Sequence, residues 1–228
     1  MEVNVDLEVP KKGELPDLPY QSLIGSLMYL ATATRPDIAY SVSYLSQFNS
    51  CYRKEHWAAA KRILIRYLKG TETLALHYRK TGETKLCGMS DASYASCKID
   101  GRSYTGFCFQ INGTVISWEA RKQRTVAGST AHAEYMALSE AAKEAMHLKY
   151  LIRHVNIAQD IVTIKTDSQG AMSWAKNPVM TSKSKHIAVK QHFIREAVLN
   201  KEIGLEFCST DEMTADVFTK ALPGPKLC

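Results

Sequence analysis

The sequence predicts an α/β fold in which helices pack on a mixed β-sheet, preceded by a small helical segment. Two observations carry this prediction. The hydrophobic period changes from helical to strand-like near residue 74, and three short strands are then followed by alternating helices and strands. Asn112-Gly113, between two of the strands, is a strong signal for a two-residue hairpin, which makes that pair antiparallel.

The first part of the chain is predicted to be helical after a flexible leader. Residues 1–19 are polar and rich in proline, and we assign them as the leader. Residues 20–80 follow as a helical connecting segment, with helices expected at 20–34, 35–48 and 56–69. Apolar residues in the third helix recur at helical spacing, and Gly70 should stop it.

The remaining residues, 81–228, are predicted to form the α/β domain. Strands, the first of them just ahead of this boundary, are expected at 74–78, 85–91, 104–111, 114–118, 161–166 and 203–208. Helices are expected at 131–154, 168–176, 187–200 and 211–222. This order of elements favours one mixed sheet with helices on its faces.

Composition narrows the class of protein. A chain of 228 residues can bury enough core to be stable without disulfides. Its six cysteines form no C-x-x-C pair and no Cys/His cluster at zinc spacing, so we interpret them as reduced thiols. The first residues lack the features of a secretion signal, and no run of about 18 apolar residues occurs. We expect an intracellular protein, cytoplasmic or nuclear, that is neither secreted nor membrane-bound.

The chain carries a moderate basic excess, with a formal net charge of +6. Two basic clusters suit the backbone of a nucleic acid, and we predict nucleic-acid contacts from Arg121, Lys122, Arg124, Lys183, Lys185, His186 and Lys190. The alternative interpretation is a solvated surface with no ligand, which charge alone does not exclude.

Four acidic residues lie in four separate segments that suit a metal-dependent nuclease: Asp91, Glu134, Asp167 and Asp216. Asp91 ends a predicted strand, Glu134 lies in the first turn of the long helix, Asp167 follows a β-branched strand, and Asp216 lies in the last helix. A hard divalent cation binds carboxylate oxygens that converge from several elements of a rigid scaffold. The sequence therefore predicts catalytic and metal-ligating roles for these four acids.

Glu134 has the best individual case. The apolar stripe of its helix includes Leu138, and one turn back along this stripe lies Glu134, so its carboxylate faces the core. A buried carboxylate is costly unless a positive charge compensates it. An N-terminal capping box would need Ser or Thr at position 131, where this chain has Ala.

The other three acids also have structural explanations. Asp167 could cap the helix that begins at residue 168, and Asp91 could make an Asx turn at the end of its strand. Asp216 falls towards the polar side of its helix and is expected to be solvated when considered alone. Topology joins them, because strand ends and helix starts can converge at one edge of a sheet, where ligand sites collect.

Several longer motifs resemble copia-type retrotransposon Pol polyproteins. Resemblance to their ribonuclease H region is carried by SDASYA (90–95), STAHAEYMALSEAAKEA (129–145), KTDSQGA (165–171), KNPVMTSKSKHI with HFIRE (176–196) and ADVFTKALP (215–223). Residues 20–48 and 56–71 resemble the segment that joins reverse transcriptase to ribonuclease H in the same family. The resemblance covers the chain in order from about residue 20 to residue 226.

This resemblance implies a ribonuclease H-like, five-stranded mixed sheet flanked by helices. It also implies endonucleolytic cleavage of the RNA strand of an RNA/DNA hybrid, with two Mg²⁺ ions or Mn²⁺ in their place. The family's four ligand positions fall on Asp91, Glu134, Asp167 and Asp216. The expected partners are the hybrid and a reverse transcriptase region, in cis or in trans.

The chain departs from the usual family pattern at several positions without removing a ligand. The usual DADW is Asp91-Ala92-Ser93-Tyr94 here. His132 stands where a Glu is usual, Ala188 where an Asp is usual, and Gln191 where an aromatic residue is usual. These changes leave an alternative open: a domesticated or decayed remnant that folds and binds nucleic acid without efficient catalysis. A third hypothesis is a structural connector that works only when joined to a polymerase.

Overall fold

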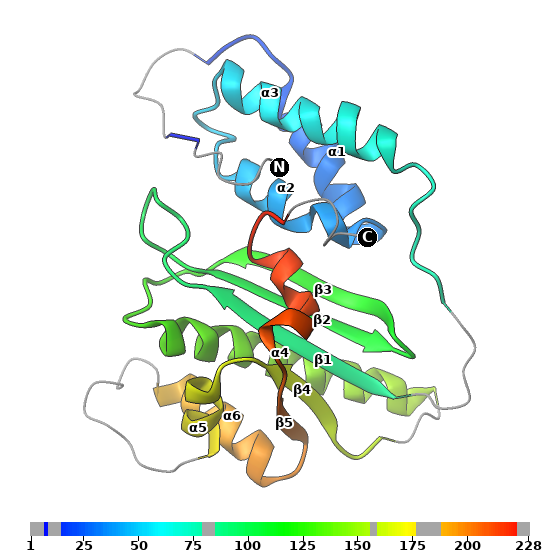
Figure 1. Ribbon diagram of the computed structural model, residues 1–228, viewed down its shortest axis with the longest axis vertical. Coiled ribbons are helices and arrows are strands. Elements are labelled where there is room, and N and C mark those ends of the chain that lie inside the picture. Colours follow the sequence, from blue (N-terminus) through cyan, green and yellow to red (C-terminus); the bar gives the residue numbers. More distant parts are fainter. Residues whose placement is uncertain (1–6, 9–14, 79–84, 156–158, 177–187, 223–228) are drawn as a thin grey trace.

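A five-stranded mixed sheet forms the centre of the computed structural model (Figure 1). The structure describes residues 7–8, 15–78, 85–155, 159–176 and 188–222, with side chains from residue 192 onward in the last of these ranges. Helix α4 packs against one face of the sheet, with α5 and α6 beside it. The opposite face is covered by a short 3-10 helix, η5, and by the N-terminal helices.

The elements follow the predicted order closely. The N-terminal part contains α1 (Tyr20–Ala33), η1 (Pro36–Ile38), α2 (Ala39–Ser46), α3 (Lys54–Arg62) and the π-helical η2 (Ile63–Leu68). The sheet domain contains β1 (Leu86–Ser93), β2 (Tyr104–Ile111), β3 (Thr114–Lys122), α4 (Thr130–His154), β4 (Val162–Thr166), α5 (Gln169–Lys176), α6 (Ala188–Leu199), β5 (Ile203–Phe207), η4 (Thr210–Glu212) and η5 (Thr214–Phe218).

The strand order across the sheet is β3-β2-β1-β4-β5. The first three strands along the chain pair antiparallel, whereas β4 pairs parallel with both β1 and β5. The predicted hairpin is confirmed: Asn112 has φ of 54° and Gly113 has φ of 76°, the left-handed backbone that a tight turn between twisted strands requires. The predicted mixed sheet flanked by helices is therefore the observed fold.

Two predicted elements were wrong. Residues 74–78 do not join the sheet, since this segment is held beside β3 by side chains: Tyr78 Oη donates to the Val115 carbonyl at 3.3 Å, and the Thr114 hydroxyl donates to the His77 carbonyl. The helix expected at 211–222 is instead two 3-10 turns, η4 and η5, because the backbone of Met213 between them has ψ of 92°.

The α4 face of the sheet holds one core. The apolar stripe predicted for this helix is buried against the strands: Leu138, Ala141, Ala145, Leu148 and Ile152. Burying side chains of this size contributes about 1.5–3 kcal/mol each for the larger ones, so this stripe fixes α4 on the sheet.

The opposite face of the sheet shares its core with the N-terminal helices. Tyr104 and Cys108 of β2 and Phe218 of η5 pack in one cluster with residues of α1 and α2. The Trp118 indole Nε1 of β3 also donates a hydrogen bond to the carbonyl of Ala31 at 2.7 Å. Because the two regions share this core, the division of the chain near residue 80 stays a prediction from sequence.

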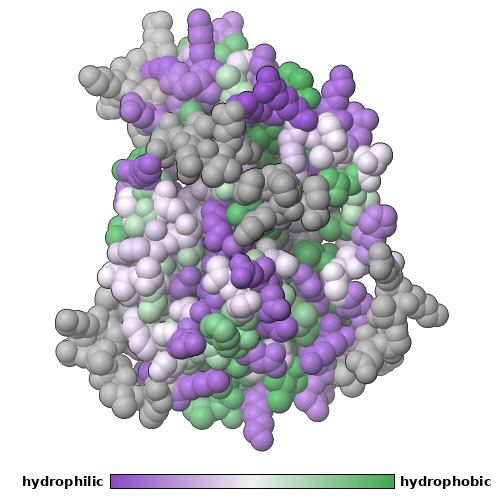
Figure 2. All heavy atoms as spheres, in the orientation of Figure 1, coloured by the Kyte–Doolittle hydropathy of each residue, from purple (hydrophilic) through white to green (hydrophobic). Residues whose placement is uncertain are grey.

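Part of the predicted leader is described. Residues 1–6 and 9–14 lie outside the described residues, but Leu7 is buried and Tyr52 Oη donates to the carbonyls of Pro16 at 3.1 Å and Leu18 at 3.0 Å. None of the described helices is long and apolar enough to cross a membrane. On the face seen in Figure 2, hydrophobic groups form small patches between hydrophilic side chains.

Candidate active site

Three of the four predicted acids converge at one edge of the sheet. Asp91 on β1, Glu134 on α4 and Asp167 directly after β4 each offer a carboxylate oxygen, and these oxygens lie within 4.8 Å of one another. The parallel register brings the two aspartates together: Met89 pairs with Lys165, and two residues further along each chain are Asp91 and Asp167. The sheet and the long helix therefore build the cluster by their topology.

Asp91 lies inside β1, not at its end as predicted. The strand continues to Ser93, and Asp91 pairs with Gly106 of β2. Only 5% of the residue is exposed, and Oδ2 of its carboxylate accepts a hydrogen bond from the Thr219 hydroxyl. An Asx turn therefore does not explain this residue, because the backbone here is paired on the ladder.

Glu134 does not cap its helix, because neighbouring residues do so. The Ser129 hydroxyl caps α4 by accepting from the His132 backbone N–H at 3.2 Å. The ring of His132 then accepts from the Gly128 N–H through Nδ1 at 3.0 Å, so this departure from the family pattern serves the start of the helix. Oε2 of Glu134 is buried and has no hydrogen-bond partner among the described residues.

Asp167 does not cap α5 either, although the sequence allowed this role. The helix α5 is capped by Ser168, whose hydroxyl accepts from the Ala171 N–H at 3.2 Å. Asp167 instead accepts a hydrogen bond at Oδ2 from the Thr210 hydroxyl at 2.8 Å, which ties it to η4. Its carboxylate therefore lies in the cluster and not on the helix terminus.

Asp216 is buried, which corrects the expectation of a solvated side chain. Only 6% of the residue is exposed, and its Oδ1 lies 2.7 Å from Nζ of Lys220. The cause is close packing of η5 on β2: a Cβ added to Gly106 would lie 2.6 Å from Cγ2 of Thr219 and 2.7 Å from Cβ of Phe218. Asp216 borders the Asp91 side of the cluster but is not one of the three converging carboxylates.

The cluster is short of positive charge. Burial, followed by repulsion from Asp91 and Asp167, raises the pKa of Glu134 to about 9. Burial, together with the charge of Asp216, also raises the pKa of Asp91 to about 6, although the Thr219 hydrogen bond acts in the opposite direction. A cation held between these groups would relieve the repulsion and satisfy the unpaired oxygen of Glu134. The all-carboxylate donor set fits a hard divalent ion such as Mg²⁺.

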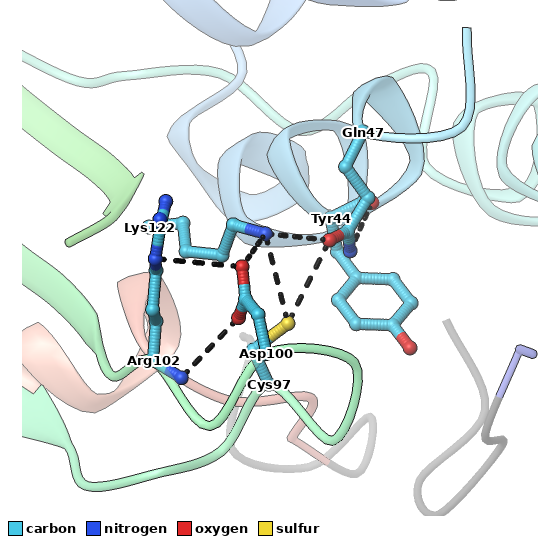
Figure 3. A network of polar contacts seen from close by, with 6 residues as sticks. All are labelled: Tyr44, Gln47, Cys97, Asp100, Arg102 and Lys122. Carbon is cyan, nitrogen blue, oxygen red and sulfur yellow. Dashed lines mark hydrogen bonds and ion pairs between the residues drawn. The ribbon is translucent and has the colours of Figure 1, made fainter. Parts of the chain in front are cut away.

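The predicted nucleic-acid-binding residues of the first basic cluster differ in their surroundings. Arg121 forms ion pairs with Glu119 at 2.7 Å and Glu140 at 3.4 Å. Lys122 is engaged in the network of Figure 3, where Nζ lies 2.8 Å from Asp100 Oδ2 and 3.1 Å from Gln47 Oε1. Arg124 is exposed in the loop before α4.

Most of the second basic cluster lies outside the described residues. Lys183, Lys185 and His186 lie outside the described residues, and so does the side chain of Lys190, although its backbone belongs to α6. The described basic residue that does lie beside the carboxylates is Lys220, which the sequence interpretation did not single out.

Three residues of the site were missed from sequence. Thr219 and Lys220 follow Asp216 by three and four residues within the ADVFTKALP motif, and that spacing could have drawn attention to them. Gln123 is buried and donates through Nε2 to the Thr105 hydroxyl and to the Ala133 carbonyl, both at 3.0 Å. It thereby links the end of β3 to the helix turn that carries Glu134.

The strand order, the helix on one face and the acids at one edge of the sheet define a ribonuclease H-like domain. Among curated relatives, the retrovirus-related Pol polyprotein of transposon TNT 1-94 from Nicotiana tabacum is 39% identical over 218 residues, which covers 96% of this chain and 16% of the relative. That of transposon RE1 from Arabidopsis thaliana is 38% identical over 204 residues, covering 89% and 14%. No protein-family model matches the chain.

The chain belongs to the family of retrovirus-related Pol polyproteins of copia-type transposons. It spans 14–16% of the length of these curated Pol relatives. It is also similar to the secreted RxLR effector protein 161 of Plasmopara viticola, with 48% identity over 132 residues that cover 58% of this chain and 92% of the effector.

Solved structures resemble the fold at low sequence identity. A foamy viral protease-reverse transcriptase in complex with double-stranded DNA has a TM-score of 0.50 and 12% identity, and the match covers 84% of this chain and 32% of that one. The N-terminal RNase H domain of Rv2228c from Mycobacterium tuberculosis has a TM-score of 0.45 and 15% identity, with 60% and 91% covered.

Proposed function

We propose that the chain is a metal-dependent ribonuclease H that cleaves the RNA strand of RNA/DNA hybrids endonucleolytically. One observation carries the proposal: Asp91, Glu134 and Asp167 bring carboxylate oxygens within 4.8 Å of one another on a ribonuclease H-like sheet. The buried oxygen of Glu134 without a hydrogen-bond partner supports it, since such a group is costly unless a ligand satisfies it.

The metal would be Mg²⁺, or Mn²⁺ in its place, held by Asp91, Glu134 and Asp167 with Asp216 as the fourth ligand. When bound, two such ions supply an activated water and stabilise the leaving 3′ oxygen in an in-line displacement. Carboxylates are the ligand type that both ions prefer.

The chain's own residues prepare the ligands. The Thr219 hydroxyl holds the carboxylate of Asp91, and the Thr210 hydroxyl holds that of Asp167, so both carboxylates are oriented before a cation arrives. Glu134, with its pKa raised to about 9, carries a proton at neutral pH in the metal-free chain and must release it to bind a cation.

Recognition of the hybrid would depend on shape and backbone charge. RNA-containing duplexes present 2′-hydroxyls and phosphates across a wide minor groove, so little sequence preference and a marked salt dependence are expected. The exposed Arg124, in the loop that leads into α4, is our assignment for a phosphate contact on this side. Because the Pol relatives are much longer, we further propose that a reverse transcriptase region acts with this chain, in cis or in trans.

The test is cleavage of a labelled RNA/DNA hybrid by the purified chain with Mg²⁺. We expect cleavage by the wild type and a loss of several orders of magnitude in Asp91→Asn, because a missing carboxylate removes a metal ligand. Asp211→Asn is the matched control, since it removes the same charge from the neighbouring η4, where Asp211 is exposed. Far-UV circular dichroism of each variant monitors the fold.

Two outcomes would count against this proposal. Full activity in Asp91→Asn would refute the assignment of the site. Hybrid binding by the wild type without cleavage, under conditions where the metal binds, would favour the inactive nucleic-acid-binding remnant.

A further inference from the structure

Resting on the proposed function, we propose that Lys220 plays two successive roles at the carboxylate site. In the metal-free chain its ammonium group occupies Asp216 and competes with a divalent ion for that carboxylate. Once ions are bound, Lys220 is released and binds a phosphate of the nucleic-acid strand in the site.

The position of Lys220 supports the first role. Its Nζ lies 2.7 Å from Oδ1 of Asp216, and its backbone N–H donates to the Asp216 carbonyl at 3.2 Å, so the side chain lies one turn above the acid. The positive charge also acts on two of the other acids, because it lowers the pKa of both Asp91 and Glu134. Lys220 therefore acts as the resident counter-charge of the cluster.

The exposure of the two partners allows exchange. The side chain of Lys220 is 42% exposed, whereas that of Asp216 is 9% exposed. The half-exposed ammonium can move into water while Asp216 stays buried, so a divalent ion, which carries twice the charge, can displace it from the carboxylate. The flexible four-carbon stem of lysine then lets the ammonium move while the backbone of η5 stays packed on β2.

Charge balance supports the second role. Four ionised carboxylates neutralise two divalent ions, which leaves the single positive charge of Lys220 without its partner at the edge of the site. One phosphodiester carries the single negative charge that would balance it. A lysine ammonium is a compact point charge that binds phosphate oxygens well, and here it would sit next to the ions that hold the scissile phosphate.

The first experiment measures Mn²⁺ binding to the full chain by isothermal titration calorimetry, without substrate. Replacing Lys220 with Met removes the competing cation, and we expect Mn²⁺ to bind at least threefold more tightly. Lys220→Arg keeps the charge and should bind as the wild type does. The matched control is Lys143→Met, since Lys143 is also a half-exposed lysine, 53% exposed, paired with Glu140 at 3.1 Å. It should leave Mn²⁺ binding unchanged.

The second experiment measures affinity for an RNA/DNA hybrid by fluorescence anisotropy at several salt concentrations, with Ca²⁺ as the divalent ion. Losing one phosphate contact should reduce the slope of log affinity against log salt by about 1. We expect this reduction in Lys220→Met, weaker binding of about fivefold at moderate salt, and recovery of both in Lys220→Arg. Lys143→Met should keep the wild-type slope.

The opposite signs of the two effects separate this proposal from a structural role, because a damaged site would lose affinity for both ligands. Unchanged or weaker Mn²⁺ binding in Lys220→Met, or an unchanged salt slope, would overturn it. A wild type that binds Mn²⁺ and cleaves the hybrid, together with a Lys220→Met variant that matches it in both assays, would defeat this inference and leave the proposed function standing. A wild type that does neither would defeat both.

Discussion

Gly106 lies directly opposite Asp91 in the antiparallel ladder of β1 and β2, and the absence of a side chain at Gly106 makes room for η5. A Cβ at this position would lie 2.6 Å from Thr219 and 3.1 Å from the carbonyl of Ala215. The same glycine therefore determines how closely η5, and with it Asp216, Thr219 and Lys220, can approach the carboxylate cluster.

Gly106→Ala should push η5 away from the sheet. We expect a loss of about 1–3 kcal/mol of unfolding free energy from overpacking and a drop in Mn²⁺ affinity of at least tenfold. Gly88→Ala is the control, because its Cβ would meet the Phe109 ring at 2.4 Å on a side remote from η5. It should destabilise the fold yet retain Mn²⁺ affinity. Equal Mn²⁺ affinity in the two variants would show that η5 does not depend on Gly106.

Thr219→Val should weaken metal binding without disturbing packing. Valine has nearly the shape of threonine but lacks the hydroxyl that holds the Asp91 carboxylate. Outer partners of metal ligands typically contribute about 10–100-fold in affinity, and a loss in that range is expected by calorimetry. Thr219→Ser, which keeps the hydroxyl, should lie close to the wild type. If the valine and serine variants bind alike, the hydroxyl has no positioning role.

The metal-free chain should lose stability as pH rises. Glu134 has a folded pKa of about 9 against an ordinary value of 4.5, and Asp91 about 6 against 3.8, so the folded state holds protons that the unfolded state has released. The unfolding free energy therefore falls between pH 4 and 6 through both groups and between pH 6 and 9 through Glu134.

Thermal unfolding in EDTA at pH 6 and pH 8.5 tests this sign. The wild type should have the lower Tm at pH 8.5, and Glu134→Gln should show a smaller difference because glutamine does not titrate. Adding Mg²⁺ should raise the Tm more at pH 8.5 than at pH 6, since the ion binds the deprotonated carboxylates. A Glu134→Gln profile as steep as that of the wild type would contradict the role given to this residue.

Lys122 and Arg124 should behave differently although both were predicted to bind nucleic acid. Lys122 is engaged with Asp100 and Gln47, so Lys122→Met should cost about 1 kcal/mol of stability and leave the salt slope of hybrid binding unchanged. Arg124→Ala should keep the stability and reduce the slope by about 1. Chemical denaturation and anisotropy separate the two effects. A reduced slope in Lys122→Met would restore its predicted role as a phosphate contact.

Local patterns were enough to predict most of the sheet domain. The Asn112-Gly113 turn, the alternating strands and the stripe through Leu138 each depend on neighbours in sequence, and each was found where expected. Segments whose conformation depends on distant contacts were not predicted. Residues 74–78 have strand-like composition but bond to β3 through side chains, and η5 follows the surface that Gly106 provides.

The site residues also differ in whether local sequence patterns predict them. Glu134 could be placed from the period of its own helix, and Asp167 from the end of its strand. The burial of Asp216 could not, because it comes from packing against a strand 110 residues earlier in the chain. For Lys220 the sequence offers only its spacing from Asp216, because the role of this lysine depends on the acids that lie around it in the folded chain.

The hydrogen bond from Trp118 to the Ala31 carbonyl has a consequence for inheritance of the gene. A recombination event that separated residues 20–68 from the sheet would uncover Trp118, Tyr104 and Phe218, and the product would be expected to aggregate. DNA encoding the helices and DNA encoding the sheet should therefore be inherited together wherever this segment remains foldable.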